Sequence, residues 1–236
     1  MKILGIESSS LVASVAVVTD DVLTAEYTVN FKKTHSQTLL PMIDQVADML
    51  DLDLNTLDAV AAAGGPGSFT GLRIGCATAK GLGLALKKPL IHVPTLEAMA
   101  YNLWGSSALV CPIMDARRNQ VYTGLYHVRH GIEAVMEQSP MDMRELADYL
   151  NGRGEPVIFL GDGVSVYRSL IEEEMKIPYE FAPAANNRQR GASVAALGME
   201  YYKKGMTVDA AQFAPDYLRK SQAEREREEK DGQADV

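Results

Sequence analysis

The residue types best suited to chemistry cluster in one glycine-rich run, residues 64–75, which reads Gly-Gly-Pro-Gly-Ser-Phe-Thr-Gly-Leu-Arg-Ile-Gly. A short apolar segment precedes the run, and a helical pattern that ends near Leu86 follows it. Glycines between a strand and a helix can bind phosphate, because backbone amides and a helix N-terminus then point at the anion. No Gly-Lys-Ser/Thr follows, so the run is not a P-loop. A tight strand-to-helix connection without a ligand accounts for the glycines equally well.

Two further polar segments could join such a site. The turn at residues 7–10 separates two strand-like segments, and a second polar group, residues 115–118, follows a later strand. The turn resembles the hairpin of the actin/hexokinase/Hsp70 superfamily, where Asp-x-Gly-Thr/Ser holds phosphate. Here the glycine is missing and the acid is glutamate, which favours a degenerate nucleotide or phosphate cleft over a working ATPase. Its predicted residues are Glu7, Ser8, Ser9, Gly65, Gly67, Ser68, Asp115 and Arg117. For Asp115, Arg117 and Arg118, the alternative is a capped β-turn with a surface ion pair worth little.

The histidines give little support to metal or nucleophilic chemistry. His127 and His130 lie at the end of a strand pattern, where side chains at i and i+3 point to opposite faces. His92 lies in an apolar strand, which is typical of a core histidine, and no Gly-x-Ser-x-Gly elbow occurs. Local patterns therefore predict neither a metal site nor a catalytic nucleophile.

The elements that must position these residues are those of an α/β protein. Period-two alternation predicts a β-meander over the first 30 residues, and strands and helices alternate after it. The expected strands cover residues 3–7, 12–18, 22–30, 59–63, 89–93, 110–114, 121–128 and 157–160. The expected helices cover residues 37–50, 70–86, a segment beginning at 95, 142–150, a segment ending near 175, and 192–203. The repeated order suggests two related lobes, 1–105 and 106–220, followed by a charged, solvated tail at 221–236.

Two of these helices carry patterns that indicate close packing. Residues 37–50 have a broad apolar face, and residues 70–86 have a stripe of very small side chains four residues apart. Because glycine in a helix costs about 1 kcal/mol relative to alanine, such a stripe suggests that another backbone lies very close. That backbone belongs either to the chain's own sheet, which is the more usual case, or to a partner helix. The residues predicted for a partner interface are Leu39, Ile43, Val46, Leu50, Gly71, Gly75, Ala79 and Gly83.

Composition and charge narrow the class of protein. The chain has 236 residues, of which 47% are hydrophobic, and its formal net charge is −8. An acidic chain has no general attraction for nucleic acid or anionic membranes, so RNA contact would need a local basic patch or a partner. No secretory signal and no run of about 18 apolar residues is visible, which predicts a cytoplasmic protein without a membrane span. Because large apolar faces are rare on monomers, we expect a homodimer when the chain is alone.

Over nearly its whole length the sequence resembles the TsaB/YeaZ family. The most specific match is the eleven-residue run from Gly65 to Gly75. Shorter motifs accompany it in order: Ile6-Glu7-Ser8-Ser9, His35-Ser36-Gln37, Pro94-Thr95-Leu96-Glu97, Asp115-Ala116-Arg117-Arg118, Gly161-Asp162-Gly163 and Pro215-x-Tyr217-Leu218-Arg219. The resemblance extends from residue 1 to about 220, and the charged tail is outside it.

The resemblance implies a two-lobed actin-like fold, in which each lobe is a mixed sheet with flanking helices. It also implies assembly with the catalytic paralogue TsaD and the ATPase TsaE. That complex transfers a threonylcarbamoyl group to the adenosine 3′ of the anticodon in tRNAs that read codons beginning with A. Family members of this type are the non-catalytic subunit, which implies no catalytic residue, no cofactor, and tRNA contact through the complex.

Departures from TsaD bear on catalysis. TsaD carries a His-x-x-x-His metal pair in a segment that resembles residues 94–100 here, and its two ligand positions fall on Thr95 and Met99. Because Thr and Met cannot replace two imidazoles on a catalytic metal, the resemblance implies no metal site. Two alternatives are a stand-alone small-molecule kinase of actin-like fold, disfavoured by the missing hairpin glycine, and a metalloprotease-like glycoprotease, disfavoured by the absent histidine pair.

Overall fold

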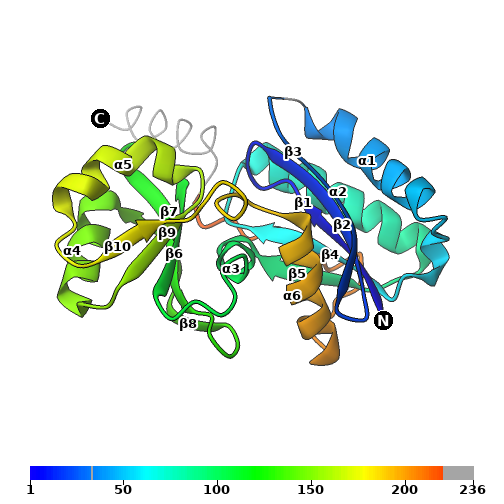
Figure 1. The fold of residues 1–236 in the computed structure, drawn as a ribbon. Coiled ribbons are helices and arrows are strands. Elements are labelled where there is room, and N and C mark those ends of the chain that lie inside the picture. The colour runs from blue at the N-terminus through cyan, green and yellow to red at the C-terminus, as the bar shows by residue number, and fades with distance from the viewer. Residues whose placement is uncertain (33, 220–236) are drawn as a thin grey trace, which may run out of the picture.

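Two lobes, each built on one five-stranded sheet, make up the chain (Figure 1). The computed structural model describes residues 1–32 and 34–219, so the predicted tail at 221–236 lies outside the described residues. The first sheet contains β1 (Lys2–Glu7), β2 (Val12–Thr19), β3 (Val22–Asn30), β4 (Ala59–Gly65) and β5 (Leu90–Pro94). The second contains β6 (Leu109–Asp115), β7 (Gln120–His127), β8 (Glu133–Asp142), β9 (Val157–Leu160) and β10 (Tyr179–Phe181).

Helices cover the sheets. Those in the described residues are α1 (His35–Met49), α2 (Phe69–Leu86), α3 (Thr95–Tyr101), α4 (Met143–Arg153), α5 (Gly163–Glu174) and α6 (Gly191–Lys203). α1 and α2 pack on one face of the first sheet, and α6 packs on the other (Figure 1). α4 and α5 pack on the second sheet, and α3 lies between the lobes. None of the described helices is long and apolar enough to span a membrane.

The two sheets share one topology. Their strand orders are β3-β2-β1-β4-β5 and β10-β9-β6-β7-β8. In each, the first three strands form an antiparallel meander, and the last two run parallel to the first. The predicted two-lobed actin-like fold, with a mixed sheet and flanking helices in each lobe, is confirmed.

The central strands of the first sheet are apolar on both faces because helices cover both. Leu4 and Ile6 of β1 face the core under α1 and α2, while Ile3 faces the core under α6. β4 is buried throughout. Strands buried on both faces carry continuous apolar runs, which is the pattern of these two segments.

The last helix follows the second lobe in sequence but packs with the first lobe in space. α6 contributes Val194 and Leu197 to the core on its face of the first sheet. After it, Val208 pairs with Leu90 at the edge of β5, with both N···O distances at 2.9 Å. The predicted boundary at residues 105 and 106 falls between the two sheets, whereas α6 and the segment after it return to the first lobe because they cover its apolar face and edge.

The packing of α6 on β1 allows no side chain at Gly5. A Cβ there would lie 2.5 Å from the Gly191 carbonyl oxygen and 2.8 Å from the Ala195 Cβ. We therefore expect Gly5→Ala to lower the free energy of unfolding in urea by roughly 1–3 kcal/mol, as overpacked cores do. The matched control is Gly152→Ala on α4, where a Cβ meets nothing within 4 Å and stability should rise by up to about 1 kcal/mol. Equal stability of Gly5→Ala and the wild type would contradict this packing.

Candidate functional site

The predicted polar segments meet in a cleft between the two lobes. The cleft has a volume of about 720 Å³. The first lobe contributes the β1–β2 turn and the start of α2, and the second contributes the end of β6 and the turn after it. The lining residues are Ser9, Ser10, Leu11, His35, Gly67, Ser68, Phe69, Met114, Asp115, Ala116, Arg117, Tyr122 and Asp162. The other residues predicted for the cleft, Glu7, Ser8 and Gly65, are buried and do not line it.

The glycines of the run let the β1–β2 turn pack directly on α2. A Cβ at Gly67 would lie 2.3 Å from the Ser9 carbonyl oxygen, and one at Gly71 would lie 2.1 Å from that of Ser8. One turn further along the helix, a Cβ at Gly75 would lie 2.3 Å from Ser8 Oγ. The backbone that approaches this part of the helix therefore belongs to the chain's own turn.

The N-terminus of α2, where a phosphate would bind, is partly satisfied by the chain itself. The Ser68 amide donates to the Ser9 carbonyl at 2.6 Å. Ser68 Oγ caps the helix by accepting from the Gly71 amide at 3.3 Å, and Ser8 Oγ donates to the Gly71 carbonyl at 2.9 Å. An anion that used the Ser68 or Gly71 amide would have to displace one of these contacts, so the geometry at those two amides favours the tight connection over a phosphate site.

Two acids from different lobes lie at the cleft: Glu7 is buried beside it, and Asp162 is half-buried in its lining. Glu7 is 1% exposed, and its Oε1 accepts from the Ser9 amide at 2.6 Å. Burial, helped by the charge of Asp162, raises the pKa of Glu7 to about 7 despite the hydrogen bonds from Ser9. Burial also raises the pKa of Asp162, whose Oδ1 accepts from Gln189 Nε2 at 3.4 Å. The raised pKa of Glu7 favours its neutral form, which weakens any attraction for a cation.

The turn after β6 holds Asp115 and Arg117 at the mouth of the cleft. Asp115 Oδ1 accepts from the Arg117 amide at 2.9 Å, and Arg117 Nη1 lies 3.2 Å from Asp115 Oδ2. Arg117, Arg118 and Asn119 have φ values of 64°, 56° and 61°. The left-handed region disfavours L-residues, so the turn stores backbone strain while it presents two exposed arginines. Asp115 therefore caps the turn and, with Arg117, lines the cleft, whereas Arg118 does not line it.

Several residues of the cleft were not predicted from the sequence. Phe69, Met114 and Tyr122 line it alongside the polar groups, and Asp162 was expected only as part of a turn. Its position between two glycines directly after β9 is a signal that could have identified it, because loops that follow parallel strands gather at one edge of the sheet.

Comparison with known proteins identifies the family. A family model described as TsaD, tRNA N6-adenosine threonylcarbamoyltransferase, matches residues 26–227. The chain is 35% identical over 225 residues to the Bacillus subtilis tRNA threonylcarbamoyladenosine biosynthesis protein TsaB, covering 95% of this chain and 96% of the relative. The chain belongs to the TsaB/YeaZ family. The Escherichia coli protein of the same name is 29% identical over 233 residues, covering 94% of this chain and 96% of that protein.

Solved structures agree with the TsaB/YeaZ assignment. YeaZ from Pseudomonas aeruginosa matches with a TM-score of 0.79 at 25% identity, over 92% of this chain and 99% of that chain. Component A of (R)-2-hydroxyglutaryl-CoA dehydratase from Acidaminococcus fermentans matches with a TM-score of 0.50 at 16% identity, over 90% of this chain and 100% of that chain. The second likeness is one of fold alone.

Thr95 and Met99, the positions at which the resemblance implied that no metal is bound, have structural roles in this TsaB/YeaZ chain. Thr95 is fully buried, and its Oγ1 accepts from the Gly65 amide at 3.2 Å. Met99 is 1% exposed and packs with Leu96 and Met114 in the apolar cluster between the lobes. Within residues 1–32 and 34–219, no group of three or more His, Cys, Asp or Glu side chains could hold a metal ion.

The residues predicted to contact a partner are already used by the first lobe, which requires a correction. Leu39, Ile43 and Val46 are at most 5% exposed and belong to its core, against which Leu50 packs. The small-residue stripe faces inward too, at Gly71, Gly75, Ala79 and Gly83. Periodicity identified the packed faces of both helices correctly, but those faces contact the chain's own sheet and turn.

The raised pKa of Glu7 makes stability depend on pH. The pKa of a free glutamate side chain is 4.5 and that of Glu7 in the folded chain is about 7, so folding favours the protonated form. This contribution is complete below pH 4.5 and is lost as pH rises through 7, a change of roughly 3 kcal/mol. We expect the stability of the wild type relative to Glu7→Gln to fall by that amount between about pH 4.5 and 8.

Urea denaturation at several pH values measures this difference. Glu173→Gln, at an exposed position on α5, controls for the loss of one carboxylate. Parallel stability curves for the wild type and Glu7→Gln would rule out the assigned pKa of Glu7.

Proposed function

We infer that this chain is a non-catalytic subunit in the biosynthesis of N6-threonylcarbamoyladenosine, at the adenosine 3′ of the anticodon in tRNAs that read codons beginning with A. It acts by binding TsaD, with TsaE in the same complex, and it contacts tRNA through that complex in the cytoplasm. Membership of a family named for tRNA threonylcarbamoyladenosine biosynthesis supports the pathway. The assignment as a non-catalytic subunit that binds TsaD is argued from the packing and exposure of the chain's own residues.

A non-catalytic role is supported by the use of the potential catalytic positions in packing. Thr95 bonds the Gly65 amide, Met99 packs in the core between the lobes, and the Ser9 carbonyl accepts from the Ser68 amide at the N-cap of α2. Any residue recruited to chemistry there would first have to leave a buried contact. The cleft is therefore better suited to holding the lobes in a fixed arrangement than to turning over a substrate.

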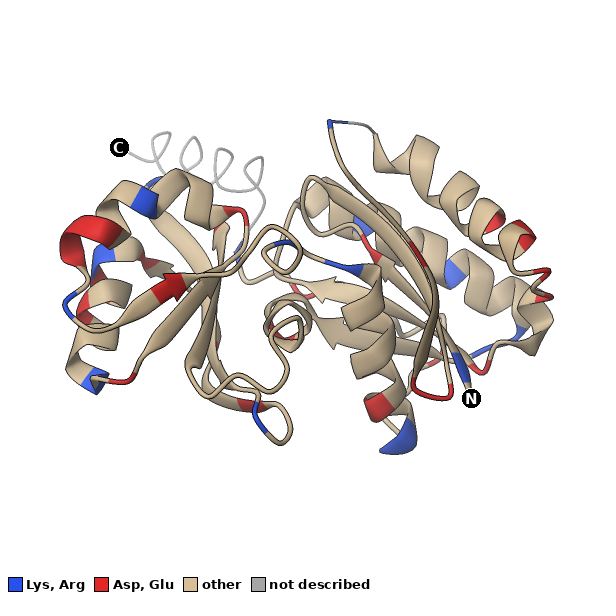
Figure 2. Ribbon diagram, in the orientation of Figure 1, with Lys and Arg blue, Asp and Glu red and all other residues tan. Residues whose placement is uncertain are grey.

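The observation that carries the partner assignment is the outward face of α1 and α2. The two helices pack side by side, and Leu40, Met49 and Leu84 on them are 55%, 79% and 67% exposed. The charged residues of α2 are Arg73 and Lys80 (Figure 2). Arg73 stacks on the Phe69 ring and Lys80 donates to the Phe213 carbonyl, while α1 carries the exposed acids Asp44 and Asp48.

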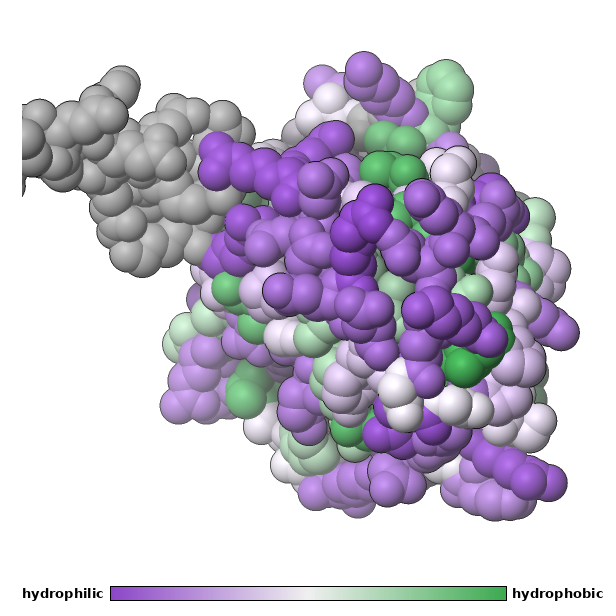
Figure 3. Space-filling model, turned by 90° about the vertical axis from the view of Figure 1, so that its left-hand side faces the viewer, coloured by the Kyte–Doolittle hydropathy of each residue, from purple (hydrophilic) through white to green (hydrophobic). Residues whose placement is uncertain are grey.

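A second stripe of small residues runs along this outward face, at Ala77, Gly81 and Ala85. A Cβ at Gly81 would meet nothing within 4 Å, so the chain's own fold does not require glycine there. Small residues let a partner helix approach toward the low end of the usual interaxial distance, about 8 Å. The stripe replaces the buried one as the proposed contact with TsaD. In contrast, the outer face of the second lobe is largely hydrophilic (Figure 3).

The same face would hold a second copy of the chain when TsaD is absent. Exposed large apolar side chains such as Leu40, Met49 and Leu84 favour burial against a partner, so homodimer and heterodimer should compete for this face. A variant that blocks the face should therefore weaken both assemblies.

Gly81→Leu tests this assignment without touching the core. The leucine should keep the partner helix away and weaken TsaD binding at least about tenfold, equivalent to about 1.4 kcal/mol. Isothermal titration calorimetry measures the affinity, and sedimentation equilibrium measures the homodimer.

The matched control is Gly152→Leu, because Gly152 is also a helical glycine whose Cβ would meet nothing within 4 Å. Both substitutions should raise the melting temperature slightly, since they remove a helical glycine. If Gly81→Leu folds normally and binds TsaD as tightly as Gly152→Leu, the interface lies elsewhere.

A further inference from the structure

The two sheets have four edges, and three of them are protected against pairing with another strand. β5 is covered by the antiparallel bridge to Val208. β10 is only 3 residues long, and β8 carries two register irregularities together with Glu133, Glu137 and Pro140. Short strands, bulges, charges and proline are the usual means by which native sheets protect their edges.

The fourth edge, β3, lacks this protection over residues 25–30. It pairs with β2 without irregularity from Ala25 to Asn30, and it carries no proline or lysine there. Its one charged residue, Glu26, is already engaged on the α6 side, where Arg190 Nε lies 3.2 Å from Oε2 and the Ala192 amide donates to Oε1 at 3.1 Å. The backbone edge is therefore regular and electrically neutral.

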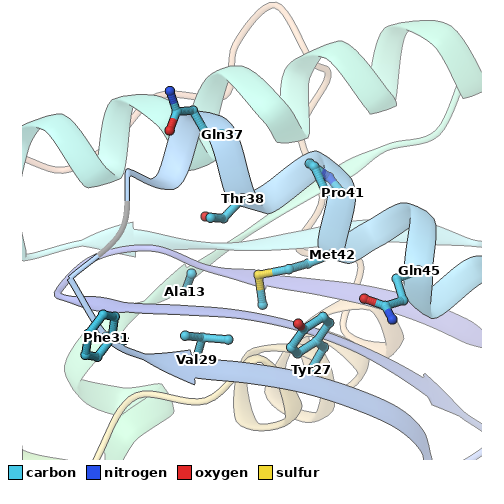
Figure 4. A pocket seen from close by; sticks show the side chains of 9 residues that line it. All are labelled: Ala13, Tyr27, Val29, Phe31, Gln37, Thr38, Pro41, Met42 and Gln45. Atoms are coloured by element: carbon cyan, nitrogen blue, oxygen red, sulfur yellow. The ribbon is translucent and has the colours of Figure 1, made fainter.

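An apolar groove runs beside this edge, between β3 and α1 (Figure 4). Tyr27 and Val29 line it from the strand, Phe31 lies at one end, and Thr38 and Met42 point into it from the helix. Its volume is about 160 Å³. A cavity of about 150 Å³ with apolar walls can hold benzene, so the groove fits one leucine or phenylalanine side chain.

The groove also offers hydrogen-bonding groups without charge. All of its lining residues are uncharged, and Gln45 supplies an amide from α1 (Figure 4). Pro41 has no N–H, so the Gln37 carbonyl lacks its helical donor, and both residues line the groove. Charge complementarity therefore selects an uncharged occupant. The chain's own residues 221–236 do not fit, because they contain six acids and three bases.

We propose that β3 and this groove bind an extended, uncharged segment of a partner protein. The segment adds to the first sheet as a further strand beside β3, and one bulky apolar side chain enters the groove between Tyr27 and Met42. Backbone hydrogen bonds supply part of the affinity in this mode of recognition, and the pocket supplies the specificity. The site is separate from the outward face of α1 and α2, so it stands or fails independently of the proposed TsaD contact.

Fluorescence anisotropy with the full chain tests the proposal. The labelled probe is an eight-residue peptide that alternates threonine and valine around one central leucine. One control probe is N-methylated at alternate backbone positions, which removes strand hydrogen bonds, and the other has aspartate in place of leucine. We expect saturable binding of the parent probe and a loss of about tenfold or more with either control.

Two variants of α1 locate the binding. Thr38→Phe fills the groove and should weaken the parent probe by about tenfold or more, whereas Ser36→Phe on the exposed side of the same helix should not. Circular dichroism melts check that both fold, and Val29→Lys on β3 replaces Thr38→Phe if that variant does not.

Several results would overturn the proposal. These are no binding of the parent probe at about 1 mM, equal binding of the N-methylated probe, or unchanged binding by Thr38→Phe. A dimer that Thr38→Phe dissociates in sedimentation equilibrium would also overturn it, because the occupant would then be a second copy of the chain.

Discussion

The contact between the β1–β2 turn and the N-terminus of α2 determines how α2 is oriented in the first lobe. Ser8 and Ser9 approach the helix so closely that Gly67, Gly71 and Gly75 can carry no side chain. The Ser9 carbonyl then accepts from the amide of Ser68, the N-cap residue of the helix. This contact fixes the rotation of α2 about its axis. Because one row of small residues must face the turn, the other row faces solvent, where a partner can reach it.

The sequence predicted the lobes and their packed faces well, but not the identity of the packing partners. The spacing of Leu39, Ile43 and Val46 correctly indicated a buried face, and the four-residue stripe on α2 correctly indicated a close backbone. Periodicity reports only that a face is packed. Whether a sheet, a turn or another protein packs there depends on long-range contacts. The small-residue stripe on α2 therefore predicted close packing, but it did not distinguish the chain's own backbone from a partner helix.

Other misses have similar causes. β8 was not predicted, because an edge strand with glutamates and a proline lacks clean alternation. The return of α6 to the first lobe was not predicted, because nothing local to that helix specifies which sheet it covers. In the cleft, the glycine run and the residues after β6 were foreseen as neighbours, whereas Asp162 was not, since it lies far along the chain in an ordinary strand-to-helix turn.

The inner surfaces of the chain thus serve its own stability, and we propose that the outer face of α1 and α2 serves assembly. Formation of threonylcarbamoyladenosine in tRNA by defined mixtures of this chain, TsaD and TsaE, supplied with threonylcarbamoyl adenylate, tests that division most directly. We expect no product with this chain alone, little with TsaD and TsaE, and full activity when the chain is added to both. Product formed by this chain alone, or full activity without it, would contradict a non-catalytic role in assembly.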